Sequence, residues 1–251
     1  MTALTPDTVV GHHILEEKLG EGGFGEVWRA RRHPDADAPP HPAEPEVVAL
    51  KVAANPGKAH SLVREARLAA KLDHPGIVRT WRVNLDTEPA HLDMDLVSGG
   101  DLAQYLVVAG GKMAWQQAVA MVATVTDAVA HAHDRNVVHG DLKPPNILIA
   151  DDTKRVLVTD FGLGRVLDAA ELSLSLSLSR SLTGIAGTVS YMAPEMLEGA
   201  TPSPTTDIYA LGAVLYEPIT GTPPAGAFEL PGPTDGTPPG SLDGGLDRRL
   251  E

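Results

Sequence analysis

Four side chains in one part of the chain can handle phosphate and metal, those of Asp141, Lys143, Asn146 and Asp160. The carboxylate of Asp141 can accept a proton from a hydroxyl group, and the ammonium group of Lys143 can neutralise a phosphoryl group. The other two residues offer an amide oxygen and a carboxylate, which are the hard oxygen ligands that Mg²⁺ prefers. A base, a cation and two metal ligands on one run of chain predict phosphoryl transfer.

These residues stand in the order of the catalytic loop and the metal-binding turn of protein kinases, a family that the chain resembles. The loop corresponds to residues 139–146, which read HGDLKPPN, and the turn to residues 160–162, which read DFG. The resemblance implies that Asp141 orients the substrate hydroxyl and takes its proton, while Lys143 stabilises the transferring phosphoryl group. It also implies that the asparagine of the loop and the aspartate of the turn hold Mg²⁺. Lysine in this loop resembles serine/threonine kinases rather than tyrosine kinases.

One residue of the loop departs from the family pattern. Gly140 stands where many relatives have an arginine that meets a phosphate group on the activation segment, so we do not expect activation by that route. The activation segment spans residues 160–195 and contains a Leu-Ser repeat at 172–179. Autophosphorylation within 173–183 is one interpretation of its hydroxyl groups, and a flexible low-complexity loop is the other.

Two further residues resemble positions that support the catalytic loop. Thr188 precedes the Ala-Pro-Glu sequence at 193–195, and the resemblance implies that it bonds the catalytic aspartate and lysine. Asp207 resembles the aspartate that braces the loop, although a role as helix N-cap would also explain an acid there. His139 and Phe161 are implied to stack in a hydrophobic spine.

The glycine-rich stretch 20–27, which reads GEGGFGEV, lies between two strand-like segments. A dinucleotide-binding fingerprint would need a helix directly after its glycines, so the phosphate-binding loop of a kinase fits better. Where side chains are missing, backbone N–H groups can approach the phosphates of ATP. An ordinary hairpin turn is the alternative. The residues implied to contact the nucleotide here are Leu19, Gly20, Gly22, Gly25 and Val27.

The next strand-like segment carries a lysine that resembles the phosphate-pairing lysine of the family. The two-residue period of a strand puts Ala49 and Lys51 on one face, where the first can cover adenine and the second can reach phosphates. Glu65, in the following helix, is the implied ion-pair partner of Lys51, and movement of that helix could switch activity. A solvated lysine and a surface glutamate are the alternatives.

Residues 91–101 resemble the strand and the hinge that contact adenine in this family. Met94 takes the gatekeeper position in this resemblance, although a plain core methionine would be equally acceptable. Asp95 and Val97 are implied to offer backbone groups to the base, so their side chains carry little information. The apolar residues expected to sandwich the ring are Val27, Ala49 and Leu148.

Composition places limits on the class of protein. The chain has 251 residues, of which 43% are hydrophobic, enough for one large domain or two small lobes. It has no cysteine, which excludes disulfides and thiolate metal sites, and its net charge of −13 argues against nucleic acid or anionic membrane as partner. No apolar run approaches the roughly 18 residues of a membrane span, so we expect a cytoplasmic protein or the cytoplasmic part of a longer, membrane-anchored one.

Periodicity and turn residues predict a small antiparallel sheet followed by helices. The expected strands lie within 15–29 and at 47–52, with a proline-rich exposed loop at 31–46. The expected helices span 61–72, 115–133 and 207–220, and Pro218 is expected to kink or stop the last of these. Residues 222–245 are rich in proline and glycine, and 246–251 hint at another helix.

The resemblance covers residues 13–221 and implies an α+β, bilobal fold with ATP in the cleft between the lobes. The expected domains are an N-terminal tail at 1–12, an N-lobe with hinge at 13–97, and a mainly helical C-lobe at 98–251 that looks C-terminally incomplete. The N-lobe should hold an antiparallel β-sheet and one helix.

The activity implied is transfer of the ATP γ-phosphoryl group to serine or threonine hydroxyls of proteins, with Mg²⁺ as cofactor. The alternative is a truncated, nucleotide-binding but weakly active fragment that acts through protein interaction. A third reading, a small-molecule phosphotransferase, is disfavoured because the segment up to 193–195 suits peptide substrates.

Overall fold

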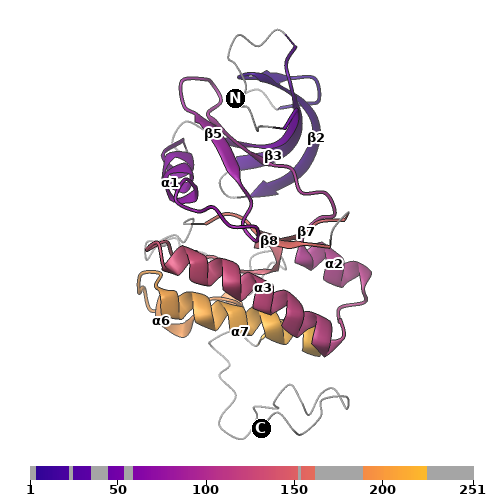
Figure 1. Ribbon diagram of the computed structural model, residues 1–251, viewed down its shortest axis with the longest axis vertical. Helices are drawn as coiled ribbons and strands as arrows, with labels where there is room; N and C mark the ends of the chain where they lie inside the picture. Colours follow the sequence, from indigo (N-terminus) through magenta and orange to yellow (C-terminus); the bar gives the residue numbers. More distant parts are fainter. Residues whose placement is uncertain are drawn as a thin grey trace, which may run out of the picture. The chain divides into compact units, whose positions relative to one another are not determined.

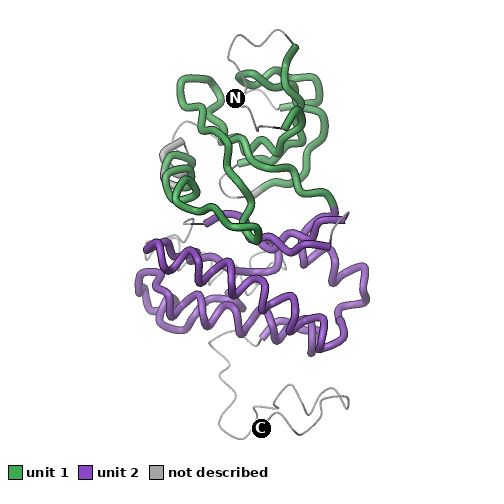
Figure 2. Tube along the Cα trace, viewed as in Figure 1, with its two compact units in different colours: residues 1–98 green, residues 99–251 purple. Residues whose placement is uncertain are grey.

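The computed structural model describes residues 4–22, 25–34, 45–53, 59–151, 154–161 and 189–224. The chain divides into two compact units, residues 1–98 and 99–251, which Figure 2 colours green and purple. Among the described residues, no helix is both long and apolar enough to cross a membrane.

The first unit is a six-stranded antiparallel sheet with the strand order β1-β2-β3-β4-β6-β5. Its longest hairpin pairs β2 with β3 and contains two register shifts, and such irregularities bend and twist a strand. The sheet is accordingly strongly curved (Figure 1). Its strands are β1 Val9–Val10, β2 His13–Gly22, β3 Gly25–Arg32, β4 Val47–Ala53, β5 Thr80–Asn84 and β6 His91–Asp95.

Both faces of strand β4 are buried. One face packs in an apolar core, and the other lies on the side of helix α1, where Lys51 meets Glu65. Val48, Leu50 and Val52 alternate along the strand and belong to a core cluster with residues of β1, β2 and β3. Ala49 and Lys51 occupy the opposite face and are buried as well. Helix α1, Ala59–Ala69, packs against β5 and β6. It begins two residues before the predicted helix at 61–72 and ends three residues earlier.

The second unit is mainly helical (Figure 1). Its long helices α3 and α7 pack side by side, and a short antiparallel pair of strands, β7 and β8, lies near the end of the catalytic loop sequence. The elements of this unit are α2 Leu102–Val108, α3 Trp115–His133, the 3₁₀-helix η2 Pro144–Asn146, β7 Ile147–Ile149, β8 Val156–Val158, α6 Pro194–Leu197 and α7 Pro204–Thr220.

Helix α3 has the predicted bounds and buries one apolar stripe that includes Ala118, Val125 and Ala132. Helix α7 starts three residues before the predicted Asp207, because Ser203 forms a capping box with Thr206 and a proline occupies the first helical position. Asp207 lies in the first turn, so its interpretation as an N-cap was wrong.

The end of α7 also differs from the prediction. Pro218 lies inside the helix, which continues to Thr220 and ends at Gly221 with φ of 85°. A proline this close to the C-terminus costs only one hydrogen bond of the last turn, and its carbonyl accepts a hydrogen bond from Met113 N at 2.9 Å. The helix therefore tolerates Pro218 without stopping there.

The predicted fold class is confirmed: an antiparallel sheet with one helix precedes a mainly helical unit. The proline- and glycine-rich stretch and the expected helix at 246–251 lie outside the described residues from position 225 onward.

Candidate active site

Lys51 and Glu65 form a buried ion pair in the first unit. The Nζ atom of Lys51 donates to both carboxylate oxygens of Glu65 at 3.0 Å, and the two side chains are 5% and 3% exposed. Strand β4 supplies the lysine and α1 the glutamate. A pair with so little access to water fixes the ammonium group in one place, which a solvated surface lysine would not do.

The residues predicted to bind the nucleotide share one face of the first unit's sheet. Residues directly opposite each other on paired strands point to the same side. Val27 is opposite Lys51, and Ala49 is opposite Met94. The apolar side chains of Val27, Ala49 and Met94 thus lie on the same face of the sheet as Lys51, and the cross-strand alignments were not visible before the strand register was known.

The glycine-rich stretch forms a hairpin between β2 and β3. Gly20 pairs with Val27 and Gly22 with Gly25, while the tip at 23–24 lies outside the described residues. Lys18 binds Glu21 on its own strand at 2.6 Å, and Glu26 across the hairpin at 2.7 Å. The hydrogen bond from Lys18 lowers the pKa of the Glu26 carboxyl. Ion pairs with this much access to water contribute little energy, but the Lys18–Glu26 pair links the two strands.

Strand β6 ends at the residues predicted to contact adenine. The backbone N–H of Asp95 donates to the carbonyl of Arg79 at 2.9 Å, and its carboxylate accepts a hydrogen bond from Trp81 Nε1 at 2.7 Å. Any backbone contact between Asp95 and a ligand must therefore use the carbonyl group. Val97 follows the strand and is half-buried, and Leu19 in β2 is 41% exposed.

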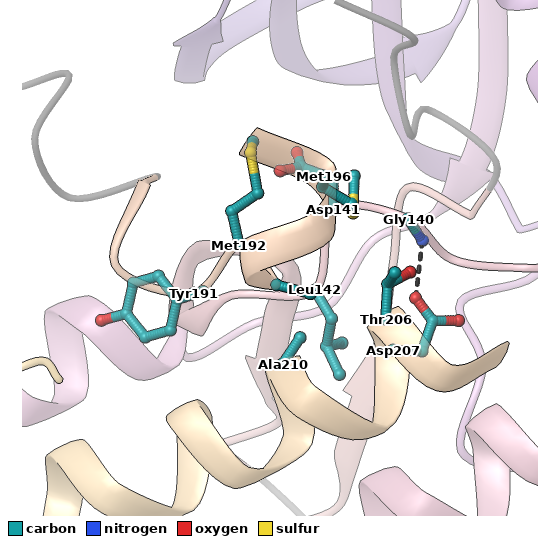
Figure 3. A pocket seen from close by; sticks show the side chains of 10 residues that line it. Gly140, Asp141, Leu142, Tyr191, Met192, Met196, Thr206, Asp207 and Ala210 are labelled. Carbon is teal, nitrogen blue, oxygen red and sulfur yellow. Dashed lines mark hydrogen bonds between the residues drawn. The ribbon is translucent and has the colours of Figure 1, made fainter. Parts of the chain in front are cut away.

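Asp207 holds the start of the catalytic loop in the second unit. Its two carboxylate oxygens accept hydrogen bonds from the backbone N–H groups of His139 and Gly140, both at 2.8 Å. One of those oxygens also lies 2.8 Å from Nε2 of His133 on α3. The bond to Gly140 is drawn in Figure 3. Gly140 has φ of 75°, a left-handed conformation that glycine adopts without steric cost.

The predicted catalytic side chains meet at Asp141. Lys143 Nζ lies 2.9 Å from its Oδ2 atom. Asn146 Nδ2 donates to the backbone carbonyl of Asp141 at 2.7 Å and is 3.4 Å from the same Oδ2. The 3₁₀-helix η2 turns the chain so that Asn146 can reach back to Asp141. The Asp141 side chain remains 26% exposed, so a substrate hydroxyl has access to it.

His139 connects the loop with the predicted metal-binding turn. Its Nδ1 accepts a hydrogen bond from Asp141 N at 3.2 Å, so Nε2 carries the proton and donates to the Thr159 carbonyl at 2.9 Å. The ring also contacts the ring of Phe161, with centroids 4.8 Å apart, which is the stacking predicted from the sequence. Asp160, between Thr159 and Phe161, has φ of 65°, an uncommon conformation for a residue with a side chain.

The donor set of this region fits a hard divalent cation. The amide nitrogen of Asn146 is committed to the Asp141 carbonyl, which leaves the amide oxygen as the atom of that group that could bind a cation. Asp160 adds a carboxylate. Mg²⁺ prefers oxygen ligands of this kind, whereas softer metals prefer nitrogen or sulfur ligands.

A small pocket adjoins Asp141 (Figure 3). Its apolar wall includes Leu142, Met192 and Ala210, and its polar edge is formed by residues that hold the catalytic loop. Tyr191, also in the wall, donates a hydrogen bond from its hydroxyl to the Glu217 carboxylate of α7, and burial raises the pKa of that hydroxyl.

Sequence reasoning missed both this pocket and the bond between Tyr191 and Glu217. The two residues are 26 positions apart, and no local spacing announces their contact. Leu148, a predicted adenine contact, lies in β7 of the second unit and is opposite Leu157 of β8. Thr188 and the hydroxyl-rich segment 173–183 lie outside the described residues.

The sequence matches the model of the protein kinase domain over residues 13–229. The chain belongs to the protein kinase family. It is 37% identical over 223 residues to the serine/threonine-protein kinase PkaA of Streptomyces coelicolor, covering 85% of this chain and 40% of that protein. It is 33% identical over 229 residues to PknA, a serine/threonine-protein kinase of Mycobacterium tuberculosis, covering 86% of this chain and 48% of PknA.

The fold is also similar to a solved protein kinase. The crystal structure of a double mutant of the Mycobacterium tuberculosis PknI kinase domain matches with a TM-score of 0.66 and 26% identity, covering 89% of this chain and 81% of that one. The predicted resemblance to bacterial serine/threonine kinases is thus confirmed. The chain spans about half the length, or less, of the two curated relatives named above. Use of ATP and a divalent metal is general in this family.

Proposed function

We propose that this chain is the catalytic part of a serine/threonine protein kinase that transfers the γ-phosphoryl group of ATP to protein hydroxyls. The observation that carries the proposal is the constellation at Asp141, whose carboxylate lies 2.9 Å from Lys143 Nζ and whose backbone is held by Asn146 and His139. Phosphoryl transfer depends on positioning and on charge stabilisation, and this loop provides for both.

Asp141 is the proposed proton acceptor for the substrate hydroxyl. It is partly exposed, it has a fixed backbone, and positioned acid–base groups of this kind contribute about 10²–10⁴-fold to a rate. Lys143 is paired with Asp141, so its ammonium group lies next to the proposed proton acceptor. There it would neutralise charge on the phosphoryl group during transfer. Thr188 is a proposed partner of both residues.

Mg²⁺ is the proposed divalent cofactor. Asn146, through its amide oxygen, and Asp160, through its carboxylate, would hold it. When bound, the ion neutralises phosphate charge and orients the nucleotide. The protein residues then position the hydroxyl and manage its proton.

In the first unit, Lys51 would hold the ATP phosphates, and Glu65 would keep its ammonium group in place. The glycine hairpin would offer backbone N–H groups to the phosphates. The proposed contacts to the rest of the nucleotide are Leu19, Gly20, Gly22, Gly25, Val27, Ala49, Met94, Asp95, Val97 and Leu148.

The proposed substrates are proteins with serine or threonine, including this chain itself within 173–183. The pocket beside Asp141 has an apolar wall, so we propose that it receives an apolar side chain near the phosphorylated residue. We place the reaction in the cytoplasm, where ATP is available, and assign residues 13–97 and 98–251 to the two lobes.

The test is transfer of labelled γ-phosphate from ATP and Mg²⁺ to a generic basic protein and to the chain itself, followed by phosphoamino-acid analysis. We expect label on phosphoserine and phosphothreonine. ATP binding without transfer would instead support a nucleotide-binding fragment, and label on phosphotyrosine alone would contradict the assigned specificity.

A further inference from the structure

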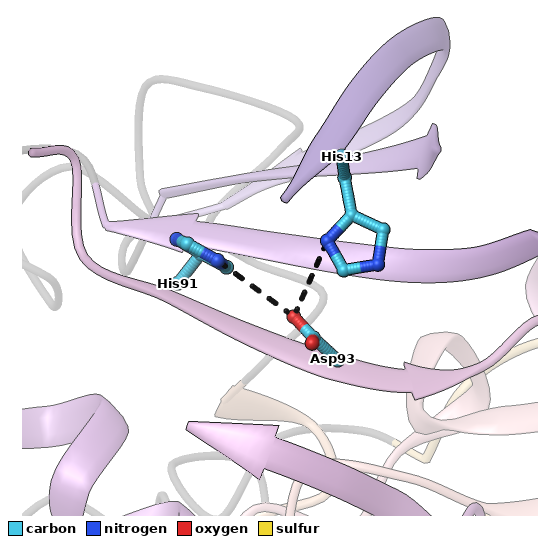
Figure 4. A group of neighbouring side chains, drawn as sticks. All are labelled: His13, His91 and Asp93. Atoms are coloured by element: carbon cyan, nitrogen blue, oxygen red, sulfur yellow. Dashed lines mark ion pairs between the residues drawn. The ribbon is translucent and has the colours of Figure 1, made fainter. Parts of the chain in front are cut away.

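Three polar side chains meet inside the first unit, away from the residues of the proposed kinase site. His13 is 2% exposed, and His91 and Asp93 are fully buried. One atom from each of them lies within 4.8 Å of the other two. His13 Nδ1 is 4.0 Å and His91 Nε2 is 3.9 Å from the same oxygen of Asp93. Figure 4 shows the two rings converging on that oxygen.

The fold brings these residues together from two strands that are not neighbours in the sheet. His91 and Asp93 alternate on β6 and so point to one side of it. His13 begins β2, which is separated from β6 by β3 and β4 in the strand order. The curvature of the sheet therefore lets β2 reach β6 across the interior.

Hydrogen bonds fix which nitrogen of His91 is available. Its Nδ1 lies 3.1 Å from the carbonyl of Pro89, which can only accept, so Nδ1 carries the proton. Nε2 then has a lone pair, and it has no hydrogen-bond partner among the residues that the structure describes. A histidine that donates one N–H to a backbone carbonyl and directs its other nitrogen at a shared point has the arrangement typical of metal ligands.

We propose that His13, His91 and Asp93 bind a divalent transition-metal ion, with Zn²⁺ as the preferred ion. Two imidazoles and one carboxylate are a common set of three protein ligands for Zn²⁺, with water in the fourth position. Ligand atoms around a tetrahedral Zn²⁺ are roughly 3.3 Å apart, given metal–ligand bonds of about 2.0–2.1 Å. The carboxylate oxygen is 3.9 and 4.0 Å from the two nitrogens, and all three atoms lie within 4.8 Å of one another, so the side chains would have to move closer together around the ion.

The proposed ion would link β2 to β6 in the buried interior of the first unit. The backbone of Gly11 lies against the Cε1–Nε2 edge of the His91 ring, since a Cβ atom there would be 2.5 Å from its Cε1 atom and 2.7 Å from Nε2. This close contact limits movement of the ring toward Gly11. Mg²⁺ should not compete, because it prefers oxygen ligands and keeps much of its water.

The test uses the whole chain, stripped of metal, without nucleotide. Zn²⁺ is titrated against a chromophoric chelator, and crystals grown with Zn²⁺ are examined for anomalous scattering at the zinc edge. We expect one tight site, a density peak bounded by His13, His91 and Asp93, and a higher melting temperature with Zn²⁺ but not with Mg²⁺. A peak at other residues, or no tight site, would overturn the proposal and leave a buried polar network without metal.

Variants give a second readout. His13→Gln and His91→Gln should each weaken Zn²⁺ binding by about 100-fold or more, by comparison with the 10–100-fold that loss of a supporting group costs. His131→Gln, a histidine on α3 in the second unit, is the matched control and should bind Zn²⁺ as the unchanged chain does. Equal binding in all three variants would contradict the site. If a ligand variant fails to fold, the anomalous peak in the unchanged protein still decides.

Discussion

Lys51 Nζ lies 3.0 Å from each carboxylate oxygen of Glu65, and both side chains are almost fully buried. Removing one partner takes this ion pair away from the buried charge of the other, which costs about 3–5 kcal/mol. We expect Lys51→Met to lower the free energy of unfolding by that amount and to abolish phosphoryl transfer. Urea denaturation and a transfer assay measure the two effects.

The double variant Lys51→Met with Glu65→Leu separates stability from activity. It removes both charges, so it should be more stable than Lys51→Met alone while remaining inactive. Simple addition of the two single losses would show that the ion pair has no coupling energy.

The carboxylate of Asp207 accepts hydrogen bonds from His139 N and Gly140 N, and lies within bonding distance of His133. Asp207→Asn keeps the shape but loses the charge and turns an NH₂ group toward these donors. Because bonds to charged groups contribute about 1.5–3 kcal/mol, we expect a loss of roughly 2–3 kcal/mol in stability and slower phosphoryl transfer. Chemical denaturation and the initial rate are the measurements. Asp134→Asn, exposed at the end of α3, should change neither quantity.

The capping box at Ser203 sets the start of α7. Its hydroxyl accepts a hydrogen bond from Thr206 N at 3.3 Å, and the N-cap is worth about 1 kcal/mol. Ser203→Ala should lower the free energy of unfolding by about that much, as measured by denaturant titration. Thr205→Ala, at an exposed position in the same first turn that takes no part in the cap bond, should cause no loss. Equal effects would mean that Ser203 does not cap the helix.

Gly11 and Gly110 provide a matched pair for the packing around His91. Both have positive φ, 57° and 78°, but a Cβ atom at Gly110 meets nothing within 4 Å, whereas at Gly11 it would clash with the His91 ring. Gly110→Ala should cost only the backbone strain, about 1–2 kcal/mol. Gly11→Ala should cost more, because a buried ring must move. Thermal unfolding of the two variants compares them, and similar losses would contradict the tight contact.

The parts predicted from sequence are those that local patterns govern. The apolar period of α3 gave both of its ends, and the motif order identified Asp141, Lys143, Asn146 and Asp160. The predicted start of α7 was wrong because the capping signal was not used. Ser203 followed by Pro204, directly before an apolar run, is a typical sequence at the start of a helix.

The parts that were missed depend on tertiary contacts. The contact between Tyr191 and Glu217, and the cluster of His13 with His91 and Asp93, join residues far apart in the chain. The cluster of His13, His91 and Asp93 depends on the strand order and on the curvature of the sheet, because β3 and β4 separate β2 from β6 in that order. No periodicity or motif in one sequence reports such a meeting.

The most direct test of the proposed activity compares the unchanged chain with Asp141→Asn in transfer of labelled γ-phosphate from ATP and Mg²⁺, with ATP binding measured in parallel. Asparagine keeps the size of the side chain and cannot act as a base. We predict that ATP binding persists and that the transfer rate falls by at least about 10²-fold. Transfer at an unchanged rate would contradict the assignment of Asp141 as the proton acceptor.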